Sequence, residues 1–212
     1  GANSTAEALD LTKHAMESGA DATLQVTPYY NKPNQDGLIK HFSAIADLGL
    51  PVVLYNIPGR TGREIAVDTV VKLSAHPNIV AIKEAGGSVE RVSAILDVCG
   101  ITLLSGDDSL ALPMISVGAK GVVSVASNVI PSQVKAMVDA ANRGNFTEAL
   151  RIHKKYYPFF RDIFVETNPI PIKAAMAVKK MTEEEYRLPI CQMSDKNRDV
   201  LIRTMKICGI LD

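Results

Sequence analysis

The stretch NIVAIKEAGGSVERVSAILDVCGITLLSGDD, residues 78–108, contains the unit that decides the fold. It opens with an apolar run at Ile79–Ile82, continues with a helical pattern at Val89–Val98 and returns to an apolar run at Thr102–Leu104. A short strand, a helix and a second short strand form a βα unit that feeds a parallel sheet. The stretch therefore predicts an α/β fold.

The same unit recurs along most of the chain. Further strands are expected at Thr23–Thr27, Pro51–Ile57 and Gly121–Val125, with helical patterns between them near 38–48, 66–73 and 110–117. Richness in Val, Ile and Leu predicts strands that are buried on both faces. Five such strands fit either an open doubly wound sheet or part of an eight-stranded barrel. A complete barrel usually needs about 250 residues, so five units with a helical tail are short of one by about three units.

The two ends of the chain depart from this repeat. Ser4 and Glu7 are spaced as a capping box, so the chain is expected to open on a helix, with a preceding segment missing. After Ser132 only helices are expected, separated in one place by the rigid stretch Asn168–Pro171. Their predicted ranges are Val134–Arg143, Phe146–Phe164, Ile172–Met181 and Asp195–Cys208.

Composition excludes several classes of function. The chain has 23 Lys and Arg and 23 Asp and Glu, and this zero net charge argues against a nucleic-acid binder. No apolar run is long enough to predict a membrane span, and no targeting leader is expected. Three cysteines without a C-x-x-C pair fit a reducing cytoplasm. No metal-ligand spacing and no nucleotide-binding motif is present, so neither a metal nor a cofactor is predicted.

Candidate catalytic residues follow the predicted strands, because active sites of both architectures lie at the carboxyl ends of the strands. Lys83 ends one apolar strand, where desolvation would favour a neutral amine that attacks a carbonyl and forms a Schiff base. The alternative is a lysine that extends to water. Tyr55, on a second apolar strand, fits either a proton relay or a core tyrosine with a satisfied hydroxyl.

Other strand ends carry less specific signals. The adjacent aromatics Tyr29 and Tyr30 suggest an interface, and Arg60 sits in a glycine-flanked turn that suits either a substrate carboxylate or a surface ion pair. Asp107 and Asp108 could hold Mg²⁺, but Asp108 is placed to cap the following helix, which is the preferred interpretation.

These residues belong to motifs that together resemble the dihydrodipicolinate synthase family of pyruvate-dependent Schiff-base lyases and aldolases. The motifs keep the family order and span nearly the whole chain: Gly1–Ala8, Val26–Pro33, Leu54–Gly62, Ile82–Ala85, Leu104–Asp108, Gly121–Val125 and Phe164–Lys173.

The resemblance assigns catalytic roles. Lys83 resembles the lysine that binds pyruvate, whose enamine then attacks the aldehyde of L-aspartate 4-semialdehyde in lysine and diaminopimelate biosynthesis. Tyr55 resembles the proton-relay tyrosine, and Tyr30 the tyrosine that reaches into a neighbouring subunit. Arg60 resembles the residue that holds the semialdehyde carboxylate. The relay threonine of the family's Gly-Thr-Thr-Gly-Glu motif is absent from this chain, so turnover is expected to be poor.

Further positions match less decisive parts of the family site. Gly106 and the backbone of Val123 resemble positions that line the pyruvyl pocket. Asn3, Glu7 and Tyr29 match part of a site at which L-lysine inhibits some members. A homo-oligomer, dimer or tetramer, is also implied.

The family fold is a (β/α)₈ TIM barrel followed by C-terminal helices. On this alignment, residues 1–144 form units four to eight of the barrel and residues 145–212 form the helical region. Two alternatives remain: a pyruvate-dependent sugar-acid aldolase or lyase, which generally lacks the turn around Arg60, and a non-catalytic remnant.

Overall fold

The computed structural model describes all 212 residues, and the chain divides into two compact units. The first unit comprises residues 1–106 and 116–122, and the second comprises residues 107–115 and 123–212. This division follows the packing of the chain. The predicted division at residue 144 follows the change from strands to helices, and it stays a prediction.

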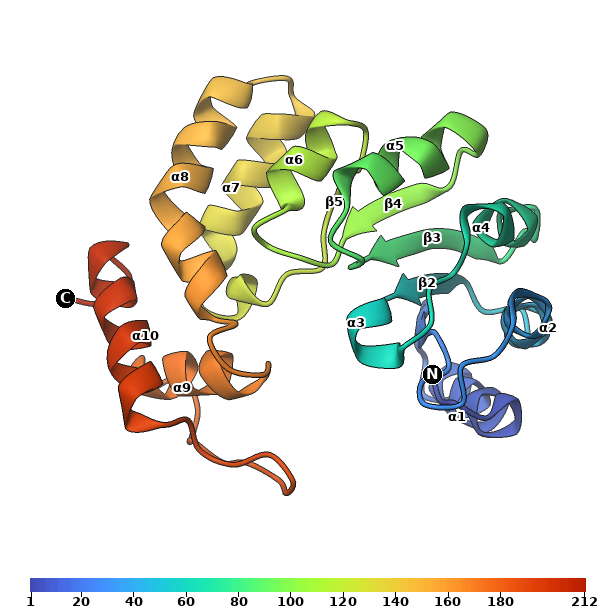
Figure 1. The fold of residues 1–212 in the computed structure, drawn as a ribbon, viewed down its shortest axis with the longest axis horizontal. Helices are drawn as coiled ribbons and strands as arrows, with labels where there is room; N and C mark the ends of the chain where they lie inside the picture. Colours follow the sequence, from blue (N-terminus) through green and yellow to red (C-terminus); the bar gives the residue numbers. More distant parts are fainter. The chain divides into compact units, whose positions relative to one another are not determined.

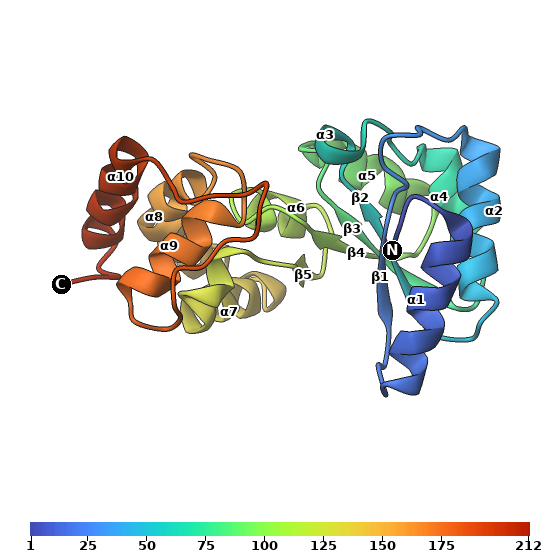
Figure 2. The ribbon, with the colours of Figure 1, turned by 90° about the horizontal axis from the view of Figure 1, so that it is seen from below.

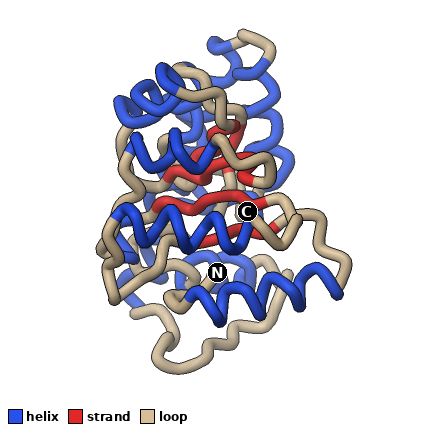
Figure 3. The backbone as a smooth tube through the Cα atoms, turned by 90° about the vertical axis from the view of Figure 1, so that its right-hand side faces the viewer, coloured by secondary structure: helices blue, strands red, loops and turns tan.

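The first unit contains a parallel sheet. Its strands are β1 (Thr23–Val26), β2 (Val52–Asn56), β3 (Ile79–Glu84), β4 (Thr102–Ser105) and β5 (Gly121–Val122). They lie in the order in which they occur along the chain, and every neighbouring pair is parallel. Figure 3 shows the strands stacked beside one another. The predicted α/β fold with a parallel sheet is therefore confirmed.

Helices alternate with these strands as the sequence predicted. They are α1 (Thr5–Glu17), α2 (Gln35–Ala46), α3 (Pro58–Thr61), α4 (Val67–Ser74) and α5 (Val89–Val98). Neighbouring helices α1, α2, α4 and α5 pack in chain order, and α2 and α4 also pack on β2 and β3 (Figures 1 and 2). This layer buries the sheet residues that face it, among them Leu54, Ile82 and Leu103.

The second unit is helical. It contains α6 (Ala111–Ser116), which ends one residue inside the first unit, a 3₁₀ turn η1 (Ala126–Asn128), α7 (Pro131–Asn142), α8 (Phe146–Asp162), α9 (Ile170–Val178) and α10 (Asp195–Ile207). Helices α7 and α8 lie side by side, and α8 and α9 each pack on α10 (Figure 1). Phe159 and Phe160 on α8 are fully buried in this core.

Three expectations need correction. The strand expected at Gly121–Val125 ends at Val122, because the chain turns into η1. Ser4 occupies the N-cap position of α1, but its side chain makes no capping hydrogen bond. Strands buried on both faces were expected, yet Leu24 and Val80 are about two-fifths exposed, at 42% and 43%. Leu24 alternates with the buried Gln25 and lies on the face that the helices of this unit leave uncovered, whereas Val80 lies at an irregularity in the pairing of β2 with β3.

Candidate active site

Lys83 and Tyr55 lie next to each other near the carboxyl ends of β3 and β2. They are partners in the parallel pairing of the two strands, so their side chains leave the same face of the sheet. The Lys83 Nζ atom lies 3.8 Å from the centroid of the Tyr55 ring. Both side chains are half-buried. The predicted lysine and tyrosine are thus brought together at the strand ends, on the face opposite the helix layer.

Gly106 borders the same lysine. Its amide donates to the Glu84 carbonyl over 2.7 Å at the end of β4. A Cβ atom at this position would lie 3.1 Å from Lys83 Cε and 2.6 Å from Ala85 Cβ. Real Cβ atoms essentially never approach another atom as closely as the second distance. The absence of a side chain at Gly106 therefore leaves room for the Lys83 side chain.

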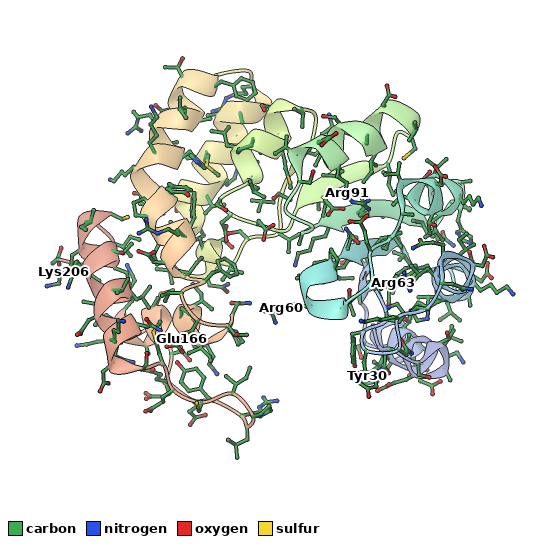
Figure 4. The ribbon with its side chains drawn as sticks, viewed as in Figure 1. Tyr30, Arg60, Arg63, Arg91, Glu166 and Lys206 are labelled. Carbon is green, nitrogen blue, oxygen red and sulfur yellow. The ribbon has the colours of Figure 1, made fainter.

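The neighbours of the pair point the other way and form a buried polar cluster. Asn56 follows Tyr55, Glu84 follows Lys83, and both are fully buried. Asn56 Nδ2 donates to both Glu84 carboxylate oxygens, at 2.8 and 3.0 Å, and the Arg91 Nε donates to Glu84 over 2.9 Å. Figure 4 places Arg91 between α5 and these strands. A buried ion pair with further hydrogen bonds thus underlies the Lys83–Tyr55 pair.

Tyr55 is also held from β1. Its carbonyl oxygen accepts the Thr27 amide over 3.1 Å and the Thr27 hydroxyl over 3.0 Å. Thr27 is fully buried. The backbone that carries the tyrosine is therefore fixed on both sides, by β1 and by β3.

The loop after β1 carries Tyr29 and Tyr30. Tyr30 is 90% exposed and has a φ of +70°, a left-handed conformation that a non-glycine residue rarely adopts. The neighbouring Asn31 donates to the Asn3 carbonyl over 2.8 Å, which ties this loop to the start of the chain. Tyr29 is 43% exposed, and Glu7 lies exposed in the first turn of α1. The two tyrosines therefore lie on the surface of the first unit.

Arg60 lies in α3, the short helix that begins two residues after β2 ends. The helix ends at Gly62, whose φ of +71° is left-handed. The Arg60 side chain is exposed and projects outward from α3 (Figure 4). A guanidinium on a tight turn beyond a strand end is placed to bind an anion by paired hydrogen bonds.

The remaining predicted positions lie in the second unit. Val123 directly follows β5 and is 36% exposed. Its predicted place in the Lys83 pocket stays a prediction. Asp108 accepts hydrogen bonds from the Ser124 hydroxyl and from the Val125 and Ala126 amides, the latter two at 2.9 and 3.0 Å. Its carboxylate thus stabilises the start of η1, a role that the sequence did not suggest.

No group of three or more His, Cys, Asp or Glu side chains is arranged to hold a metal ion. No helix has the length and apolar character needed to cross a membrane.

The buried cluster of Asn56, Glu84 and Arg91 was missed by the sequence analysis. The available signal was the position of Asn56 and Glu84, each directly after a predicted site residue on an apolar strand. No signal in the sequence pointed to Arg91, because its contact with Glu84 depends on how α5 packs on the sheet.

Comparison with known proteins agrees with these motifs. Residues 1–208 match the Dihydrodipicolinate synthetase family. A 4-hydroxy-tetrahydrodipicolinate synthase of Citrifermentans bemidjiense is 48% identical over 209 residues, which are 97% of this chain and 72% of that protein.

Solved structures give the same result. A chloride-inhibited dihydrodipicolinate synthase from Acinetobacter baumannii, complexed with pyruvate, is 41% identical with a TM-score of 0.97 over 100% of this chain and 74% of that one. A dihydrodipicolinate synthase from Cyanidioschyzon merolae with lysine bound is 44% identical with a TM-score of 0.96 over 99% and 72% of the two chains. By sequence motifs, family match and fold, this chain belongs to the dihydrodipicolinate synthetase family.

Proposed function

We propose that this chain is a Schiff-base lyase, a 4-hydroxy-tetrahydrodipicolinate synthase that condenses pyruvate with L-aspartate 4-semialdehyde. The observation that carries the proposal is the 3.8 Å contact between Lys83 Nζ and the Tyr55 ring. It joins a potential nucleophile to a potential proton carrier at the carboxyl ends of two parallel strands, where active sites of this architecture lie.

The chemistry follows from the lysine amine. In its neutral form the amine attacks the C2 carbonyl of pyruvate, and loss of water leaves an imine. Loss of a proton from the adjacent methyl group gives an enamine, whose carbon attacks the aldehyde of the second substrate. Tyr55 carries protons between these steps. The amino group of the condensed semialdehyde then attacks the imine carbon, which closes the ring and releases the Lys83 amine.

Arg60 is the proposed anchor for the second substrate. Its exposed guanidinium, beyond the end of β2, suits a bidentate grip on the semialdehyde carboxylate. Gly106 keeps the space beside Lys83 open, and the backbone of Val123 is proposed to line the same pocket. No cofactor takes part in this scheme.

Tyr30 and its neighbours are proposed to act between subunits. An aromatic side chain that is 90% exposed, on a backbone with positive φ, is costly in an isolated chain and is typical of a functional contact. A homo-oligomer, dimer or tetramer, would cover it. The lysine-bound relative supports a regulatory site for L-lysine, to which Asn3, Glu7 and Tyr29 would contribute.

The finer fold assignment and the location of the protein complete the proposal. The five strands correspond to strands four to eight of a (β/α)₈ barrel, because a doubly wound sheet reverses its strand order and this sheet does not. Residues 145–212 form the C-terminal helical region. Three free cysteines, one of them exposed, fit a reducing cytoplasm.

The test is to trap the imine. The chain is incubated with pyruvate and borohydride, and the modified peptide is mapped by mass spectrometry. A pyruvyl adduct that maps to Lys83 and is lost in Lys83→Met supports the proposal. Lys135→Met, which replaces an exposed lysine, is the control and should still form the adduct at Lys83. No adduct at Lys83 would contradict it. A 2-keto sugar acid offered in parallel tests the aldolase alternative, which predicts cleavage that does not change in Arg60→Ala.

A further inference from the structure

We propose that Asn56, Glu84 and Arg91 form a positioning network for the Lys83 amine, an inference that rests on the proposed function of that lysine. The network lies on the face of the sheet opposite Lys83 and Tyr55. It therefore does not touch the substrates. It is proposed to act through the two strand ends that carry the reacting side chains.

The pairing of β2 and β3 couples the two faces. Tyr55 pairs with Lys83, and the next step along the strands pairs Asn56 with Glu84. The Asn56 side chain binds both oxygens of Glu84, while its carbonyl accepts the Ala85 amide over 2.9 Å. A shift of β3 against β2 would break all three bonds. The polar pair thus fixes the alignment of Tyr55 with Lys83.

The Glu84 carboxylate has no capacity left for another role. It accepts four hydrogen bonds: two from Asn56, one from the Gly86 amide over 2.7 Å and one from Arg91. A Cβ atom at Gly86 would lie 2.6 Å from Glu84 Oε1, so the turn after β3 closes on this carboxylate. Four donors are the environment of an ionised carboxylate, which requires a compensating cation nearby.

Arg91 supplies that cation and extends the network. Its guanidinium also donates to the Ile65 carbonyl and to Glu64, the latter over 3.2 Å. Ile65 in turn donates its amide to the Asn56 side chain over 3.0 Å. Arg91 thus joins α5 to both strands and to the segment before α4. Helix, strands and loop are held together at the level of Lys83.

The ion pair should also act on Lys83 through its charge. Removing the Glu84 charge leaves the Arg91 cation unbalanced beneath the lysine, which favours the neutral amine. Removing the Arg91 charge has the opposite effect, because the carboxylate then favours the ammonium form. If the network only stabilised the fold, removing its two charges one at a time would not shift the protonation of Lys83 in opposite directions.

Few other charges of the first unit could obscure this effect. On the strands that flank β3, Tyr55 is the one titratable side chain of β2, and β4 has none. Helix α4, which packs on β3, carries Asp68 and Lys72, and both are exposed. Glu64 is half-exposed and already bonded to Arg91.

The experiment compares the whole chain with Glu84→Gln, Arg91→Met and the double variant. Two rates are measured between about pH 6 and pH 10: borohydride trapping with pyruvate, and acetylation of Lys83 by acetic anhydride without pyruvate. Glu184→Gln is the matched control, because it breaks the Glu184–Arg198 ion pair in the other unit. Thermal unfolding of every variant is recorded in parallel.

We expect the midpoint of the acetylation profile to fall by about half a pH unit in Glu84→Gln and to rise by a similar amount in Arg91→Met. The midpoint of the double variant should return toward that of the parent chain. The midpoint of Glu184→Gln should equal that of the parent chain. Trapping rates should fall in both single variants because the amine is displaced. Midpoints that stay fixed or move together, with only stability reduced, would overturn the inference.

The two proposals fail separately. If the parent forms no pyruvate adduct but acetylation midpoints move in opposite directions, the network acts on Lys83 and the proposed function is wrong. If the parent forms the adduct and the midpoints do not separate, the function stands and the positioning role is lost.

Discussion

The Lys83 amine lies 3.8 Å from the centre of the Tyr55 ring, and the two residues are partners in the pairing of β3 with β2. Their separation is therefore set by the spacing of neighbouring strands. A cation over an aromatic face is attracted by the ring itself, apart from any role of the hydroxyl. Packing and chemistry at Tyr55 can consequently be separated by mutation.

Tyr55→Phe keeps the ring beneath Lys83 and removes the hydroxyl. We expect trapping of pyruvate to slow by about 100-fold if the hydroxyl carries protons, with the free energy of unfolding changed by about 1 kcal/mol or less. The rate is measured as borohydride-trapped adduct against time. Tyr157→Phe, at a 44% exposed tyrosine on α8, is the control and should keep the parent rate. Equal rates for Tyr55→Phe and the parent would exclude the relay role.

Gly106→Ala places a methyl group against Ala85 Cβ and Lys83 Cε, where 2.6 and 3.1 Å are available. Strand ends must move apart to accept it, so we expect a loss of about 1–3 kcal/mol in stability and a large loss of adduct formation at Lys83. Urea unfolding and peptide mapping measure the two effects. Gly100→Ala is the matched control, since a Cβ there meets no atom within 4 Å. A fully active, stable Gly106→Ala chain would contradict the proposed pocket.

Asn56→Ala tests the buried cluster by stability alone. The substitution removes two hydrogen bonds to Glu84 and one from the Ile65 amide, and it leaves buried polar atoms without partners. We expect a loss of about 2–4 kcal/mol in the free energy of unfolding, measured in urea. Asn128→Ala removes one exposed hydrogen bond to the Val125 carbonyl and should cost about 0.5 kcal/mol or less. Similar losses of unfolding free energy in Asn56→Ala and Asn128→Ala would show that the buried cluster contributes no more to stability than one exposed hydrogen bond.

The pH dependence of stability should report on His41. Burial lowers the pKa of this imidazole to about 4, and its Nδ1 lies 2.9 Å from the Thr5 hydroxyl while Nε2 has no partner. The unfolded chain binds the proton near pH 6.5. The stability that neutral His41 gives is therefore complete above about pH 6.5 and is lost as the pH falls toward 4, by about 2 kcal/mol.

Urea unfolding at several pH values between 4 and 7.5 measures this loss. His41→Gln should flatten the dependence in that window. His14→Gln, at an exposed histidine on α1, should keep it. A dependence that survives in His41→Gln unchanged would assign it to other groups.

Local sequence patterns predicted most of the secondary structure. The helix at Val89–Val98 begins and ends where it was expected, because Ser88 caps it by accepting the Arg91 amide and the apolar spacing is strictly helical. The strand expected to run to Val125 was too long, because the strand preference of Val123 and Val125 is overridden by the hydrogen bonds that Asp108 accepts from the Val125 and Ala126 amides. Such contacts between distant residues are invisible to local patterns.

The site shows the same limit. Lys83 and Tyr55 could be selected because each lies on an apolar strand, where a polar side chain is unexpected. Asn56 and Glu84 sit on equally apolar strands, yet their importance depends on which face of the sheet the helices cover. Arg91 could not be selected at all, since an arginine in the first turn of a helix resembles any surface residue until α5 is packed.

The order of the strands has a consequence for how the chain folds. Every strand pairs with the strand that comes next along the chain, so each pairing closes only the short segment between them, which holds one helix or, between β2 and β3, the two helices α3 and α4. A short segment costs less conformational entropy to close than a long one, although parallel pairing still forms more slowly than purely local contacts. Successive strands can therefore pair one after another as the polypeptide leaves the ribosome, and β3 completes the Tyr55–Lys83 pair before the final helices have been synthesised.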